Sequence, residues 1–144
     1  MLTGDLSQMG QLASRLRDLA SVPSRAAGVV SDRIEALIQE EFDAGADPYG
    51  NAWAPLAEST LARGRSAPPL TDTGAMRDSV RVAPLARAGV GVTIDHPAGV
   101  HQTGWDGASG KGPARPILPR GVMPARWSEA IKSAVSDTVR KVMR

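Results

Sequence analysis

Apolar residues recur at helical spacing at both ends of the chain, and this pattern restricts the fold more than any other feature. Near the N-terminus they are spaced by three or four, at Leu2, Leu6, Met9, Leu12, Leu16 and Leu19. Near the C-terminus the same spacing joins Trp127, Ile131, Val135, Val139 and Val142. Such spacing places apolar side chains on one face of an amphipathic helix. We therefore expect a helix at each end.

Pro23 interrupts the first stripe, and a second helix is expected to follow it. Ser24 is a candidate N-cap, and the sequence AGADPYG at 44–50 ends the helix. Its apolar positions are Val29, Val30, Ile34, Leu37, Ile38 and Phe42. Its C-terminal end carries Glu40, Glu41 and Asp43. These acids oppose the helix dipole, which suggests an interaction surface.

The middle of the chain changes to shorter periods. Residues 80–94 alternate apolar with other residues on both sides of the sequence ARAGVG, which predicts a β-hairpin with Pro84 near an edge. Short helical turns are expected at 58–64, after Thr71 or Thr73, and at 96–104 before Gly104. Asp72 and Asp78 are expected to pair with Arg77 and Arg81.

Two further segments complete the prediction. Residues 105–114 are rich in glycine and predict a flexible loop, and residues 117–124 are compatible with a short strand. The fold class is therefore α+β, with a small antiparallel β-sheet flanked by a long N-terminal helix and a C-terminal helix. We expect an N-terminal amphipathic helical extension over 1–22 and a single α+β domain over 23–144.

Length and composition exclude several classes. A chain of 144 residues suits one small core, and the absence of cysteine excludes disulfides and thiolate metal sites. The N-terminus lacks the pattern of a signal peptide, and no apolar run approaches the ~18 residues of a membrane span. We therefore expect a soluble protein with no membrane partner.

Charge is distributed unevenly along the chain. Residues 1–60 carry nine acids against four arginines, a net charge of −5, and residues 61–144 carry thirteen lysines and arginines against six acids, a net of +7. Such polarity can orient a molecule against a neighbour or against nucleic acid. Ordinary solvated faces explain it equally well.

Motifs of catalysis and metal binding are incomplete. His96 and His101 lie five residues apart, which is not the one-face spacing of a helical metal pair. The DPYGN segment at 47–51 lacks calcium ligands, and GASGKG at 107–112 lacks the full phosphate-loop pattern. The sequence also has no nucleophile elbow. We expect no enzyme, no catalytic residue, no metal and no cofactor.

Basic side chains near the predicted loops offer an alternative function. A non-specific nucleic-acid-binding module would use the basic C-terminal half, although no helix-turn-helix or zinc-finger pattern accompanies it. The candidate contacts with a neighbour or with DNA are Arg63, Arg65, Lys111, Arg120 and Arg126.

Four short motifs follow one another in a particular order. The first covers 47–56 and matches Asp47, Pro48, Gly50, Trp53, Pro55 and Leu56. The second matches Leu70, Thr73, Gly74, Arg77 and Ser79. The third matches Ala98, His101, Gln102 and Gly104, and the fourth Arg115, Pro116, Ile117 and Leu118. In this order they resemble the phage virion morphogenesis family, the tail-completion proteins of Mu-like phages and their relatives. The likeness covers about residues 25–143.

The resemblance implies a structural virion protein located at the neck, the head–tail junction. Such a protein completes the head-proximal end of the tail and joins it to the filled head. Copies are expected to form a ring, a hexamer, around the DNA channel. The implied partners are other copies of the chain, head-closure or connector proteins and the tail tube protein, with non-specific contact to DNA in the channel. Within the first motif, Asp47 and Asn51 are expected to form a turn, and Trp53 to anchor it to the core.

Overall fold

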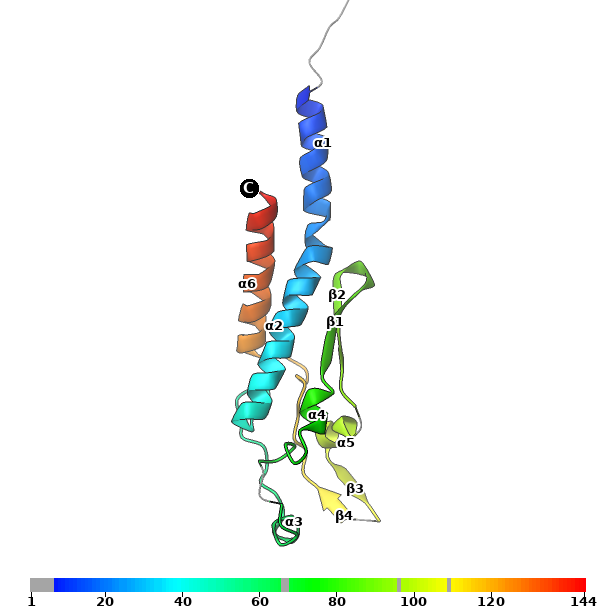
Figure 1. Cartoon of the computed structure of the whole chain (residues 1–144), viewed down its shortest axis with the longest axis vertical. Helices are drawn as coiled ribbons and strands as arrows, with labels where there is room; N and C mark the ends of the chain where they lie inside the picture. Colours follow the sequence, from blue (N-terminus) through cyan, green and yellow to red (C-terminus); the bar gives the residue numbers. More distant parts are fainter. Residues whose placement is uncertain (1–6, 66–67, 96, 109) are drawn as a thin grey trace, which may run out of the picture.

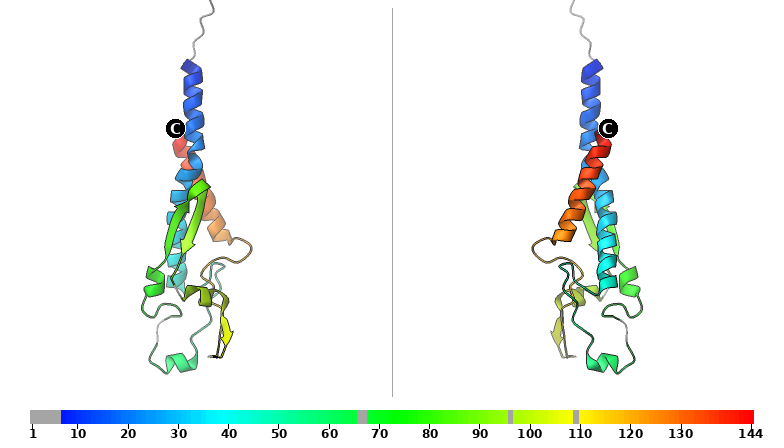
Figure 2. Two further views of the ribbon diagram at one scale, coloured as in Figure 1. Left: turned by 90° about the vertical axis from the view of Figure 1, so that its right-hand side faces the viewer. Right: turned by 90° about the vertical axis from the view of Figure 1, so that its left-hand side faces the viewer.

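Two long helices and a shorter one form the upper part of the molecule (Figure 1). The computed structural model describes residues 7–65, 68–95, 97–108 and 110–144. Helix α1 spans Ser7–Ala20, α2 spans Val22–Ala44 and α6 spans Ala125–Val142. Helix α2 lies between α6 and a β-hairpin, and α1 extends beyond the ends of both (Figures 1 and 2).

Helices α1 and α2 are nearly continuous. Ser21 between them has helical dihedral angles, its N–H donates to Arg17 O at 3.2 Å, and its carbonyl accepts from Arg25 N at 3.1 Å. Pro23 lies in the first turn of α2, where the missing N–H costs nothing. The predicted cap is therefore wrong: Ser24 lies inside the helix and its hydroxyl donates to Ser21 O. At the other end Gly45, with φ 62°, terminates α2 as expected.

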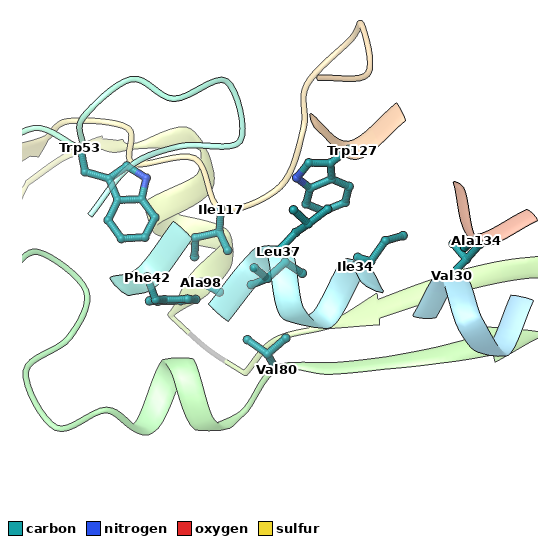
Figure 3. Close-up of a cluster of buried hydrophobic side chains, with 11 residues drawn as sticks. Val30, Ile34, Leu37, Phe42, Trp53, Val80, Ala98, Ile117, Trp127 and Ala134 are labelled. Carbon is teal, nitrogen blue, oxygen red and sulfur yellow. The ribbon is translucent and has the colours of Figure 1, made fainter. Parts of the chain in front are cut away.

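The core lies along α2. Five of the six predicted apolar positions are buried, and the sixth, Val29, is 36% exposed. From α6, the buried side chains are Trp127, Ala134 and Thr138, whereas Val135 and Val139 are 38% and 37% exposed. The predicted stripe on α6 is thus partly wrong, because the contact face passes through small Ala134, which faces Val30 (Figure 3).

Short elements connect α2 to α6. They are α3 Glu58–Leu61, α4 Ala75–Asp78, β1 Arg81–Leu85, the 3-10 turn η1 Ala86–Ala88, β2 Gly89–Thr93, α5 Ala98–Thr103, β3 Trp105–Gly107 and β4 Gly110–Gly112. Strands β1 and β2 pair antiparallel from Arg81 opposite Thr93 to Leu85 opposite Gly89, which confirms the hairpin. Val80 at its start is buried beneath α2 (Figure 3).

One expectation for these segments was incomplete and one was wrong. Residues 105–107 and 110–112 pair antiparallel, so a second hairpin lies within the segment expected as a flexible loop, and the flexibility stays a prediction. Residues 117–124 are all described and contain no strand. The α+β class is confirmed, with two two-stranded sheets among the described residues.

No helix within the described part of the chain is long and apolar enough to cross a membrane.

Candidate functional site

The first motif folds into a tight turn after α2. The Asp47 carboxylate accepts from the backbone N–H groups of Tyr49 at 2.9 Å and Asn51 at 2.8 Å. The backbone N–H of Gly50 donates to Asp47 O, and Gly50 has φ 89°, which favours glycine. The expected turn around Asp47 and Asn51 is confirmed. Pro48 is the residue after Asp47 in this turn.

Tyr49 extends this turn to the segment before α6. Its hydroxyl lies 2.5 Å from Arg120 O and 2.7 Å from Val122 O, and it accepts from Arg120 N at 3.0 Å. Tyr49 carries no predicted role. Nothing local in the sequence identifies a partner 71 residues away.

Trp53 anchors the turn to the core, as predicted. Its ring meets Phe42 edge-on, with centroids 5.5 Å apart, and its Nε1–H donates to Pro116 O at 2.8 Å. Ile117 packs in the same cluster (Figure 3). One side chain from the first motif thereby contacts both the end of α2 and the fourth motif.

Arg115 ties the fourth motif to the first from the opposite direction. It is 5% exposed, and its guanidinium donates to Ala54 O and to Pro55 O, both at 2.7 Å. Its backbone N–H donates to His101 O at 2.7 Å. Burial lowers the pKa of the guanidinium, but an arginine stays charged at neutral pH. Arg115 is therefore a positioning residue with its cation directed at backbone carbonyls.

Gln102 joins the third and fourth motifs through three hydrogen bonds of its side-chain amide. Its Oε1 accepts from Ile117 N at 2.8 Å and Leu118 N at 2.9 Å, and its Nε2 donates to Leu118 O at 2.7 Å. Gly104 ends α5 with φ 74°, and an added Cβ would lie 2.7 Å from Gly112 O. Only glycine fits at this approach of the two backbones.

The second motif attaches to the end of α2. Arg77 donates from Nε to Gln39 Oε1 and forms an ion pair with Asp43, both at 2.7 Å. Thr73 Oγ1 accepts from Ala75 N at 3.3 Å, so Thr73 supports the start of α4, while Gly74 with φ 74° is the N-cap residue.

The predicted ion pairs of this segment were wrong. Asp72 pairs with Arg65 at 2.9 Å, and Arg81 donates to the backbone carbonyl of Asp78. Tertiary structure decides these pairs, because α2 and the 62–65 turn present closer partners than the neighbouring residues of the same motif.

The acids at the end of α2 are occupied within the chain. Glu40 pairs with Arg126, and Asp43 pairs with Arg77. Glu41 is 2% exposed, and its Oε1 accepts from Trp127 Nε1 at 2.8 Å. These acids were expected to form an interaction surface. Their contacts instead hold α6 and α4 against α2 within the same chain.

The carboxyl group of Glu41 has a strongly raised pKa. Burial raises its pKa to about 7, against the opposing effects of the Trp127 hydrogen bond and the Arg126 charge. Its Oε2 has no hydrogen-bond partner among the described residues. Because α2's apolar periodicity passes directly through position 41, a buried acid there could have been suspected from the sequence.

A groove of about 790 Å³ opens beside this cluster of motifs. It lies between the α3 region and the α5–β3–β4 region, and Pro55, Thr73, His101 and Arg115 contribute to its wall. The His101 ring meets Trp105 edge-on, with centroids 6.0 Å apart.

Two charged side chains of the groove are engaged within the protein. Its Arg115 and Asp72 side chains are directed at other protein groups. No group of three potential metal ligands occurs within the described residues, and His96 lies outside them.

Three of the five basic candidates for DNA or neighbour contact have acid partners. Arg65 pairs with Asp72, Lys111 with Asp106 at 3.0 Å, and Arg126 with Glu40. Arg63 and Arg120 are exposed and lack an acid partner among the described residues. The five do not gather into one unopposed basic patch.

Comparison with known proteins identifies one relationship. The model of the phage virion morphogenesis family matches residues 5–144, nearly the whole chain. No curated protein and no solved structure matches it.

Proposed function

We propose, from the premise that this chain belongs to the phage virion morphogenesis family, that it completes the head-proximal end of a phage tail and joins the tail to the head. Membership of the family supports a structural virion protein and not an enzyme. The narrower role, at the neck of a tailed phage, is the proposal.

The main support for the proposal is that residues of the motifs bind one another. Trp53, Gln102 and Arg115 each hydrogen-bond to backbone of another motif. These hydrogen bonds hold the loops of the motifs together beside the groove. Such an arrangement suits a protein selected for shape and for contacts with other proteins.

We further propose that copies assemble into a ring, a hexamer, whose partners are the head-closure or connector proteins and the tail tube protein. The sequence suggested that the acidic residues 1–60 of one copy attract the basic residues 61–144 of the next. The structure gives this attraction less weight. Glu40–Arg126 and Asp43–Arg77 each pair an acid of residues 1–60 with a base of residues 61–144 inside one chain. Contact between copies then depends on surfaces that are not already neutralised.

The alternative, a non-specific nucleic-acid module, gains no support from the geometry. Lys111, Arg65 and Arg126 would have to leave their acid partners to contact phosphates. Arg63 and Arg120 can still face DNA in a channel, as an accessory contact.

The test is complementation of a phage in which this gene is inactivated. We expect filled heads and unjoined tails to accumulate, and infectious particles to return when the full chain is supplied. Electron microscopy of the lysates distinguishes joined from separate particles. Negative-stain images of the purified chain, alone and with tails, should show a ring.

A matched pair of variants separates folding from surface effects. Arg63→Ser removes an unpaired exposed cation, while Arg115→Met removes a buried one that holds the loop assembly. We expect Arg63→Ser to complement and Arg115→Met to fail. Joined, infectious particles in the complete absence of the chain would rule out the proposed role.

A further inference from the structure

Helix α1 displays an uncovered apolar stripe. All 14 of its residues are exposed, and Met9, Leu12, Leu16 and Leu19 are 66%, 58%, 57% and 39% exposed. Packing this apolar face against another surface would stabilise the helix by removing apolar area from water. Helix α1 therefore has an apolar face that no other described residue covers.

The stripe continues the seam by which α2 packs on α6. Steps of three and four residues run through α1 and on through α2, at Met9, Leu12, Leu16, Leu19, Pro23, Ala27, Val30, Ile34, Leu37 and Glu41. The backbone hydrogen bonds at Ser21 carry the helix across the junction. On α2, the positions from Ala27 to Glu41 are buried. One continuous face is thus covered along α2 and bare along α1.

The α6 helix of the same chain cannot cover the rest. It ends at Val142, beside the base of α1, and α1 extends past it (Figure 1). No segment among the described residues covers the upper part of this face.

A second uncovered stripe runs along the end of α6 and includes the residue after it. Val135, Val139 and Met143 follow one another at intervals of four and are 38%, 37% and 63% exposed. Among the described residues, the exposed large apolar side chains form runs at helical spacing on α1 and α6, while the others are isolated or paired along the sequence. The two stripes are similar in length and in chemistry.

We propose that the α1 stripe of one copy packs on the α6 stripe of a second copy of this chain. The proposal rests on the self-assembly proposed above and names the two surfaces that would perform it. Because the two surfaces differ, the contact can repeat head-to-tail from copy to copy, and it closes into a ring when the rotation allows.

Charges flanking the two stripes predict how salt acts on the contact. Helix α1 carries Arg15 and Arg17 against Asp18, and the last turns of α6 and the residues after it carry Arg140, Lys141 and Arg144 against Asp137. Both sides are net positive, so attraction must come from apolar burial. Added salt screens the repulsion and should strengthen association, whereas it weakens binding to DNA.

The absence of cysteine from the natural sequence permits a direct test by cross-linking. Single variants Leu16→Cys and Val139→Cys are purified, mixed and oxidised, so that any disulfide joins two different copies. We expect a cross-linked dimer from this mixture. Ser14→Cys, on the opposite face of α1 by helical spacing, mixed with Val139→Cys is the control and should stay uncross-linked. A dimer from Leu16→Cys alone, or none from the mixture, would overturn the proposal.

A second experiment separates this inference from the proposed function. Leu12→Ser with Leu16→Ser should shift the chain from oligomer to monomer in sedimentation velocity and abolish complementation, with unchanged near-UV circular dichroism. Gln11→Ser with Ser14→Ala is the control, and it should assemble normally. An oligomeric, complementing Leu12→Ser/Leu16→Ser chain would refute the α1 contact and leave the neck role standing. A wild-type chain that complements without self-associating would refute both the ring and this contact.

Discussion

The two halves of the long N-terminal helix have the same apolar spacing and opposite surroundings. Helix α2 is covered by α6 and by the β1–β2 hairpin, and nine of its residues are buried, whereas every residue of α1 is exposed. Periodicity therefore predicts that a face exists without predicting what covers it. In α2 the cover is intramolecular, and in α1 we propose that it is a second copy.

Removing an apolar side chain from the covered region should have the largest effect on stability. Trp53→Ala deletes a side chain that is 6% exposed, packs on Phe42 and donates to Pro116 O. We expect it to lower the free energy of unfolding by about 4 kcal/mol. Urea denaturation followed by circular dichroism measures the loss. Trp53→Phe, which keeps most of the packing and removes only the N–H donor, should cost about 1 kcal/mol. Equal costs for the two variants would show that packing of the indole is not what anchors the turn.

Arg115 tests whether the motif residues act through backbone carbonyls, as the covered region implies. Arg115→Met keeps much of the side-chain volume but leaves Ala54 O and Pro55 O without their donors. We expect a loss of about 3 kcal/mol in unfolding free energy. Arg115→Lys, with its single point charge, should recover only part of it. If Arg115→Met instead unfolded like the wild type while losing function, Arg115 would belong to a binding surface.

Glu41 makes the stability of the covered region depend on pH. The folded protein holds the Glu41 proton up to a pKa of about 7, while the unfolded chain releases it near the ordinary value of 4.5. Stability from this residue is therefore greatest below pH 4.5 and falls as pH rises towards 7.

Glu41→Gln isolates this effect, because glutamine stays neutral and keeps an acceptor for Trp127 Nε1. At pH 8 we expect the variant to be more stable than the wild type by on the order of 2 kcal/mol, with the difference shrinking at pH 5. Thermal unfolding across pH 5–8 measures it, with Glu35→Gln on the exposed face of α2 as the control. A constant difference across this range would exclude titration of Glu41 as its source.

Sequence reasoning succeeded where structure is local and failed where a partner is distant. The α2 stripe, the β1–β2 hairpin and the Asp47 turn follow from spacing and turn chemistry within a few residues. The partners of Arg77 and Tyr49 lie 34 or more residues away along the chain, so no local pattern specifies them. On α6, periodicity gave the helix correctly but placed its contact face one position away from Ala134, because close packing selects a small residue there.

The family resemblance supplied what periodicity could not at the candidate site. It grouped Trp53, Gln102 and Arg115 before their contacts were known, and the structure brings all three into one assembly. It did not indicate Glu41 or Tyr49, which support the same assembly from outside the matched positions.

The smallest expected effect is the most informative about α1. Leu16 is 57% exposed, so Leu16→Ala should change the unfolding free energy of the dilute, monomeric chain by less than about 0.5 kcal/mol. At concentrations where copies associate, the same substitution removes apolar area from the proposed contact, and its cost should rise to about 2 kcal/mol. Denaturation repeated across a hundredfold range of protein concentration measures this difference. Trp53→Ala, whose contacts lie within one chain, should show the same loss at every concentration. A large cost for Leu16→Ala in the dilute monomer would mean that α1 is covered from within its own chain, and the contrast between the two helices would disappear.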